Sequence, residues 1–330
     1  MVFALHLSGG GGLILLTGGS GFLGQAILKS LSGLQPIRAA IRQPNLSISF
    51  PSGIEIIDAT LSPEQDWLNA LSGVSTVIHC AARVHIMKES SLDPLAEFRR
   101  VNVAGTLNLA LQASRSGVRR FIFISSIKVN GEYTDLGRPF SSVETNFPVG
   151  PYAVSKYEAE IGLRAISKET GMEVVIIRAP LIYGPRVQAN FRSMMNWLQS
   201  GIPLPFGGIT KNRRSYIFLD NLVDLIITCI NHPAAANQTF LVSDGEDLST
   251  TELLRRMYLA LGLPARLFSV PPAYITLCAM LIGRGDISSR LCCSLQIDIK
   301  KTMNLLGWFP PFSVDEGLRQ TAAHFLKARS

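Results

Sequence analysis

Two side chains in the middle of the chain have types and spacing suited to proton transfer. Tyr152 and Lys156 lie four residues apart in the stretch PYAVSKYEAE, and residues i and i+4 of a helix share one face. A free phenol has a pKa of about 10 and exchanges protons poorly at neutral pH. A neighbouring ammonium favours the phenolate, so we expect Lys156 to lower the pKa of Tyr152. Tyr152 is then a workable acid and base at a carbonyl or carbinol oxygen.

A hydroxyl group that holds this oxygen is also needed, and the stretch ISSIKVNG supplies two. Ser125 and Ser126 end an apolar run upstream of Tyr152. A Tyr-x-x-x-Lys pair alone is common by chance. Downstream of a strand that ends in serine, and of a glycine-rich loop, it is a more specific sign of an oxidoreductase site.

The glycine-rich loop lies in LLTGGSGFLG, residues 15–24. Gly18, Gly21 and Gly24 form GxxGxxG, and the pattern GxGxxG is met from Gly19. Either pattern is weak alone, but this loop follows a predicted strand and opens a predicted helix. Absent side chains let the backbone approach a pyrophosphate, and the helix N-terminus supplies oriented N–H groups. The loop predicts a bound dinucleotide, with contacts from Gly18, Gly21, Phe22, Leu23 and Gly24.

The end of the second predicted strand indicates which dinucleotide is bound. An acidic residue there holds the ribose 2′-hydroxyl of NAD, whereas an arginine accommodates the 2′-phosphate of NADP. The chain reads AAIRQP, with Arg42 and no acid. This favours NADP and leaves NAD as the alternative. Asp58, at the end of the next strand, is expected on the adenine side. Pro180, Tyr152 and Lys156 are assigned to the cofactor as well, with Lys156 reaching its ribose.

These residues need a scaffold that gathers the ends of strands. The first half contains apolar, β-branched runs without polar alternation, which indicates strands buried on both faces of a parallel sheet. Helical patterns separate the runs, so we predict an α/β, doubly wound Rossmann fold. The predicted strands cover residues 13–17, 37–42, 54–58, 74–82, 120–126 and 173–180, and the main helices cover 21–33, 95–117 and about 152–170.

The second half is punctuated by proline and glycine and predicts a smaller, discontinuous C-terminal substrate lobe. We expect a Rossmann domain over 13–180, with about 214–242 packing back onto it. The lobe then covers 181–213 and 243–330, and 1–12 is an N-terminal leader. Trp197 and Trp308 are expected in the core. The apolar tract at 273–283 is too short to span a bilayer, so we expect a buried helix there, with a membrane-surface contact as the alternative.

Composition narrows the partners. The net charge of +7 favours an anionic partner, but lysine and arginine are spread thinly. A small diphosphate therefore fits better than a nucleic acid. The five cysteines form no CxxC pair, which indicates a reduced, cytoplasmic protein and no metal site. His79 is expected to be buried and hydrogen-bonded. Arg83 and His85 follow a strand at its carboxyl end and are expected to contact substrate.

Further motifs extend the pattern along nearly the whole chain, in the order TGGSGFLG, VIHCAAR, VNVAGTLNL, FISSIKVNG, PYAVSK, IIRAPLIYGP, RRSYIFLDNLVD and LLGWFPPFSVDEGL. In this the chain resembles the extended short-chain dehydrogenase/reductases that act on nucleotide sugars. The resemblance implies a catalytic triad of Ser126, Tyr152 and Lys156, and commonly a homodimer. It implies cofactor contacts at Ala81, Ala82 and Asn102, and UDP-sugar contacts at Asn190 and Arg214. Apart from the resemblance, Ser125 is expected to contact substrate, and Arg290 is a second candidate for the diphosphate.

Three departures distinguish among members of that family. Dehydratases carry Asp-Glu after the catalytic hydroxyl, where this chain has Ile127 and Lys128. UDP-galactose 4-epimerases usually carry a tyrosine at the position of Asn130 and a substrate-binding asparagine where this chain has Leu181. The stretches SSIKVNGE and NFRSMMNWL look most like bacterial UDP-4-keto-6-deoxy-N-acetylglucosamine 4-reductases, which serve O-antigen and hence lipopolysaccharide synthesis.

The expected activity is therefore NAD(P)-dependent hydride transfer at C4 of a UDP-sugar, with three readings kept open. The first is the 4-reductase. The second is a UDP-glucose or UDP-N-acetylglucosamine 4-epimerase with tightly bound NAD. The third and more distant reading is a non-catalytic, NADP-binding redox sensor, although such proteins commonly lack the Tyr–Lys pair.

Overall fold

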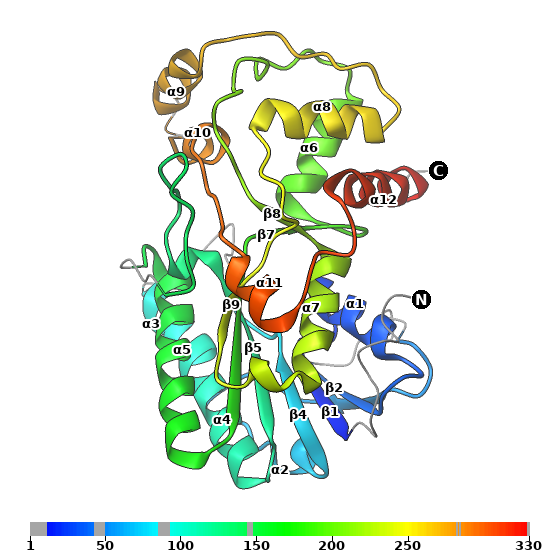
Figure 1. Cartoon of the computed structure of the whole chain (residues 1–330), viewed down its shortest axis with the longest axis vertical. Coiled ribbons are helices and arrows are strands. Elements are labelled where there is room, and N and C mark those ends of the chain that lie inside the picture. Colours follow the sequence, from blue (N-terminus) through cyan, green and yellow to red (C-terminus); the bar gives the residue numbers. More distant parts are fainter. Residues whose placement is uncertain are drawn as a thin grey trace.

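A computed structural model of the chain describes residues 12–42, 50–84, 93–143, 148–281, 283 and 285–328, without the side chains of residues 189, 190, 286 and 287. A seven-stranded parallel sheet lies in the lower half of the molecule as drawn in Figure 1, in the order β3-β2-β1-β4-β5-β6-β9. The chain runs outward from β1 to β3 and returns to β4, which is the doubly wound order. The predicted fold class is confirmed. The strands are β1 (Leu13–Thr17), β2 (Ile37–Ile41), β3 (Glu55–Asp58), β4 (Val74–His79), β5 (Arg120–Ser126), β6 (Glu173–Ala179) and β9 (Thr239–Leu241).

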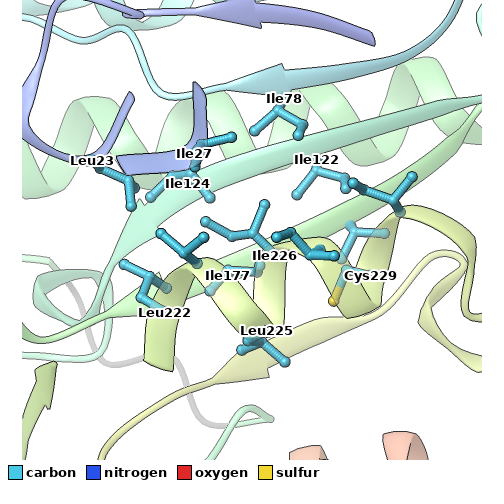
Figure 2. Close-up of a cluster of buried hydrophobic side chains, with 14 of the residues drawn as sticks. Leu23, Ile27, Ile78, Ile122, Ile124, Ile177, Leu222, Leu225, Ile226 and Cys229 are labelled. Atoms are coloured by element: carbon cyan, nitrogen blue, oxygen red, sulfur yellow. The ribbon is translucent and has the colours of Figure 1, made fainter. Parts of the chain in front are cut away.

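Helices cover both faces of the sheet (Figure 1). Successive strand residues point to opposite faces, so Ile122 and Ile124 pack under one helical layer, whereas Phe121 and Phe123 pack under the other. Figure 2 shows the first of these cores, where α1 and α7 meet the sheet. Burial on both faces explains why the strands show no polar alternation. One layer contains α1 (Phe22–Leu31), α7 (Leu219–Asn231) and α11 (Lys300–Leu306), and the other contains α2 (Leu68–Leu71), α4 (Thr106–Arg115) and α5 (Pro151–Thr170).

Local sequence signals fix the ends of α5. Pro151 occupies its first position, where a missing N–H costs nothing. Gly171 ends the helix at φ 77°, a left-handed conformation that glycine adopts without strain. Tyr152 therefore lies in the first turn, with Lys156 one turn later.

A π-helical segment precedes α4. The chain forms α3 (Pro94–Phe98), continues through seven π-helical residues, Arg99–Gly105, and then enters α4. Segments of this kind are rare and occur frequently at functional sites. Here the segment contains Asn102, whose side chain is buried.

The second half of the chain forms what we call the small lobe: β7 (Leu181–Tyr183), β8 (Tyr216–Phe218), α6 (Ala189–Gln199), α8 (Thr250–Ala260), α9 (Pro272–Leu281), α10 (Gly285–Cys292) and α12 (Val314–Lys327). Strands β7 and β8 pair with each other and were not predicted. Phe191, Met195 and Leu198 point into a core of the small lobe. Trp197, on the opposite face of α6, is 58% exposed, so its predicted burial is wrong, whereas Trp308 is buried as expected.

The segment between these elements returns to the large sheet, since α7 covers one face and β9 extends the edge beside β6. Helix α9 forms where an apolar helix was predicted, but none of its residues is buried. The predicted burial is therefore wrong, because α9 packs against α10 and outside the core of the small lobe. Among the described residues, we find no helix with the length and apolar character needed to cross a membrane.

Candidate functional site

The predicted residues gather along one edge of the large sheet because the carboxyl ends of parallel strands meet there. Each strand from β1 to β6 contributes at or just after its last residue. Thr17 ends β1 before the glycine loop, and His79 ends β4 before the Ala81 segment. The contributing residues are Gly18 after β1, Arg42 after β2, Asp58 at the end of β3, Ala81 and Ala82 after β4, Ser126 at the end of β5 and Pro180 after β6.

The glycine loop forms a cradle that side chains would fill. Gly18 has φ +74°, and a Cβ there would lie 2.8 Å from the backbone nitrogen of Ala81. A Cβ on Gly24 would overlap the carbonyl oxygen of Gly18. The first turn of α1 has no acidic residue, and its N-cap, Gly21, offers no side-chain cap. The N–H groups of this turn are thus left for an anion such as a pyrophosphate.

Gly24 is a position of the loop where the close packing against Gly18 requires a glycine. We expect Gly24→Ala to weaken dinucleotide binding at least about tenfold, because the loop must shift to relieve the overlap. Titration of the purified protein with NADPH and NADH measures this. The matched control is Gly285→Ala at the start of α10, outside the loop, where a Cβ would meet no atom within 4 Å. Equal losses in both variants would contradict the assignment.

The catalytic candidates lie on α5 and at the end of β5, which are in contact. The ring of Tyr152 lies edge-on to Phe98 of α3, with centroids 6.2 Å apart. Lys156 is buried, and its Nζ donates a 2.9 Å hydrogen bond to the carbonyl oxygen of Ile124. The Ser126 hydroxyl accepts a 3.3 Å hydrogen bond from the N–H of Lys128. Lys156 thus ties the helix of Tyr152 to the strand of Ser126.

Burial sets the protonation of this pair. It raises the pKa of Tyr152 to about 12 and lowers the pKa of Lys156 to about 8. Our expectation that Lys156 lowers the pKa of Tyr152 is not met, because the cost of burying a phenolate dominates and the ammonium points to a carbonyl oxygen. Tyr152 is therefore neutral at pH 7, and Lys156, one helical turn later, is still charged.

The pKa of Lys156 predicts an alkaline limit to activity. We expect kcat/KM to fall above about pH 8 as the ammonium deprotonates. The pKa of Lys156 in the folded protein lies below the ordinary value of 10.5. Between about pH 8 and pH 10.5 the unfolded chain therefore binds more protons than the folded one. The contribution of Lys156 to the free energy of unfolding thus rises with pH in this range. Thermal melts over the same range will separate the two effects. A profile that stays flat to pH 10.5 would rule out the role of Lys156.

Asn102 connects the loop after β4 with the first turn of α5. Its Nδ2 donates to the carbonyl of Arg83 and to the hydroxyl of Ser155, both at 3.0 Å, and its Oδ1 accepts from the N–H of Arg83 at 2.7 Å. The Ser155 hydroxyl donates to the carbonyl of Tyr152 at 2.8 Å. A cofactor lying on this loop would thus be placed relative to Tyr152, which is the role expected for Asn102.

A buried polar network under the site was not predicted. The Ser125 hydroxyl donates to Glu160 at 2.6 Å, so the serine predicted to contact substrate is engaged in the core. Arg178 gives Glu160 two hydrogen bonds, at 2.7 and 3.0 Å, and donates to Asn130 at 2.9 Å. Burial alone would raise the pKa of Glu160, but Arg178 holds it below its ordinary value. The signal was present, since a charged residue inside an apolar strand needs a buried partner.

His79 is structural, as expected. Its two ring nitrogens lie 2.6 Å from the hydroxyl of Thr17 and 2.9 Å from that of Thr106. Burial lowers its pKa to about 3, so the ring is neutral at physiological pH. The contacts fasten β4 to β1 and to α4 beneath the glycine loop.

The predicted substrate contacts belong to the small lobe and to loops that face it. The backbone of Arg214 pairs with Leu248 and Leu295, and its Nη1 donates to the carbonyl of Cys293 at 3.0 Å. Arg290 is exposed on α10, and the guanidinium of Arg83 lies 5.6 Å above the ring of Phe98. His85 and the side chain of Asn190 lie outside the described part of the chain. Within that part, no three His, Cys, Asp or Glu side chains are grouped to hold a metal.

Known proteins share this architecture and sequence. A UDP-glucose 4-epimerase of Vibrio cholerae is 47% identical over 319 residues, covering 96% of each chain. The solved UDP-glucose 4-epimerase of Thermotoga maritima superimposes with a TM-score of 0.77 at 22% identity, covering 96% of this chain and 100% of that one. A UDP-glucuronic acid 4-epimerase of Bacillus cereus also gives a TM-score of 0.77, at 19% identity with the same coverage. At such identities the solved structures establish the fold.

The family relationship rests on sequence. The sequence of residues 14–243 matches that of the NAD dependent epimerase/dehydratase family. This stretch contains the glycine cradle, Ser126, Tyr152 and Lys156. The glycine cradle fits the dinucleotide that the family's name implies. The chain therefore belongs to the NAD dependent epimerase/dehydratase family and is an enzyme of the extended short-chain dehydrogenase/reductase type.

Proposed function

We propose that this enzyme reduces the C4 ketone of a UDP-4-keto-6-deoxyhexosamine on the route to a surface polysaccharide such as O-antigen. The observation that carries the proposal is a Tyr152 phenol that is neutral at pH 7, on a helix that Lys156 ties to the strand that ends at Ser126. A ketone reductase needs a proton donor of this kind. The homodimer and the cytoplasmic location expected from the sequence stay predictions.

Each residue of the site has a separate role in the proposed reduction. Ser126 would hold the C4 oxygen, and Tyr152 would donate its proton to that oxygen as negative charge develops there. Lys156 would stabilise the tyrosinate that remains. The glycine cradle would hold the pyrophosphate of the cofactor and Arg42 a 2′-phosphate, and the nicotinamide supplies the hydride when it is bound. Arg214 and Asn190 are proposed to bind the diphosphate of the sugar nucleotide.

A 4-epimerase is the second candidate, and the relative from Vibrio cholerae favours it. Two local features favour the reductase instead. The Asn130 side chain, at the usual tyrosine position of the epimerases, is buried against Arg178 and not available to substrate. Leu181 is 46% exposed where those enzymes have a substrate-binding asparagine, and it offers no hydrogen bond.

Cofactor exchange separates the candidates, because an epimerase retains its NAD whereas a reductase must release spent cofactor. The purified protein is first examined for bound NAD by absorbance and extraction. It is then incubated with UDP-glucose or UDP-N-acetylglucosamine, and separately with the 4-keto-6-deoxy sugar nucleotide and NADPH. Consumption of NADPH with the keto sugar alone supports the reductase. Retained NAD with interconversion of UDP-sugars supports the epimerase, and NADPH binding without turnover points to a sensor.

A further inference from the structure

Helix α9 exposes a broad apolar face, whereas Ile275, Thr276 and Ala279 on its other side are half-buried. Tyr274, Leu277, Met280 and Leu281 are each between 54% and 78% exposed, and no residue of the helix is buried. Helices that face water have a polar side, and a helix that is apolar all round is normally covered. A contiguous apolar surface of this kind marks a place where another body binds.

The sequence around α9 is uncharged, and two segments of the small lobe are rich in basic residues, of which Arg213 pairs with Glu252. Residues 267–281 contain no charged side chain. Residues 189–213 and 260–293 contain six lysines and arginines and a single acid, Asp286, which is most of the net +7 of the chain. The two segments are held together, since Leu204 pairs with Leu267 and Arg266 donates to the carbonyl of Gly201 at 2.8 Å.

The apolar face of α9 and the basic segments together favour an anionic bilayer over a second copy of the chain as the partner that covers α9. A two-fold contact with a second copy places the same surface on both sides of the interface, which would bring the basic segments of one copy against those of the other. An anionic bilayer offers the opposite charge and an apolar layer at once. With ten residues, α9 is about 15 Å long, too short to span a bilayer. It would therefore lie in the interfacial layer.

We propose that the small lobe docks on an anionic lipid surface, with α9 inserted in the interfacial layer and the side chains of Arg192, Lys211, Arg266 and Arg290 facing the headgroups. Figure 1 shows α9 at the outer end of the small lobe, at the far end of the molecule from α2. The docking is independent of the reaction proposed above.

Vesicle flotation with the full chain tests the proposal. We expect the protein to float with vesicles of phosphatidylglycerol and phosphatidylcholine, less so as salt is raised, and little with phosphatidylcholine alone. Leu277→Glu/Met280→Glu should lower the partition coefficient at least about tenfold, because it puts two charges into the apolar layer. The matched control is Leu34→Glu/Leu68→Glu, which makes the same charge change at exposed leucines on the large-sheet half. The control should float like the wild type.

Three results would overturn the proposal. The first is a wild type that ignores anionic vesicles. The second is an equal loss in both double variants, which would reduce the effect to net charge. The third is a wild type that does not bind vesicles and that light scattering shows to be an oligomer, with a lower mass only in the α9 double variant. This result would make α9 a contact between protein chains. Thermal melts of both variants confirm that the fold is intact before binding is compared.

Discussion

Replacing Tyr152 with phenylalanine is expected to lower kcat by about 10²- to 10⁴-fold, the range that a positioned proton donor contributes. The change removes one oxygen and keeps the ring that packs edge-on against Phe98. Binding of the dinucleotide is expected to stay within about threefold, because Asn102 reaches this turn of α5 through Ser155 and the backbone carbonyl of residue 152. Steady-state kinetics and a cofactor titration on the same preparation measure both effects.

The matched control is Tyr157→Phe, the same change five residues later on the same helix. Tyr157 is half-buried and was assigned no role, so this variant should turn over like the wild type. If Tyr152→Phe keeps full turnover, the proposed proton donor is wrong, whatever substrate is assigned. If both variants lose activity together with dinucleotide binding, the helix has been disturbed and not the chemistry.

Replacing Arg178 with methionine is expected to lower the free energy of unfolding by about 3–5 kcal/mol, a large part of the roughly 5–15 kcal/mol typical of a folded domain. Arg178 and Glu160 are both almost inaccessible to solvent, and their closest atoms lie 2.7 Å apart. Without Arg178, the Glu160 carboxylate remains buried with Ser125 and the half-exposed Arg164 as partners. Urea denaturation measures the loss.

The matched control is Arg99→Met, which removes an arginine from an exposed pair with Glu158. Surface pairs contribute about 0–1 kcal/mol, so this variant should be nearly neutral. The double variant Arg178→Met/Glu160→Leu should recover much of the loss, because a buried pair can often be replaced by apolar residues of similar volume. Equal losses in Arg178→Met and Arg99→Met would show that the buried pair is not a key support of the fold.

The large sheet was predictable because burial on both faces leaves a direct record in the sequence. The predicted strands agree with β1 to β6 to within a few residues at their ends. Strands β7, β8 and β9 have three residues each, too few for a run or an alternation to be recognised. Their pairing depends on contacts between distant segments, which no local pattern contains.

The site was predictable where it depends on topology and unpredictable where it depends on packing. Strand ends meet at one edge in any doubly wound sheet, so the contributions of Gly18 and Ser126 to that edge followed from the strand order. The direction of Ser125 could also have been inferred, because it shares the parity of Phe121 and Phe123, which face the layer of α5. The raised pKa of Tyr152 depends on burial by distant residues, which spacing along the chain does not report.

The helix α9 shows a different limit of sequence patterns. Its composition correctly indicated a helix, but composition does not say whether the core of the protein or another body covers its apolar side chains. The same holds for Trp197, whose size predicted burial although its place on α6 turns it outward. In both cases the missing information is the geometry of the neighbouring elements.

The late return of α7 to the large sheet has a consequence for how the protein is made. When Ala179 at the end of β6 has been synthesised, six strands of the sheet are complete. The helix α7, which packs over Ile122, Ile124 and Ile177, is complete only at Asn231. At about 5–20 residues per second, that face of the nascent sheet waits about 3–10 s for its cover. During this interval the growing chain exposes an apolar face of the sheet. The yield of folded protein in a cell then depends on whether a chaperone binds that face before another nascent chain does.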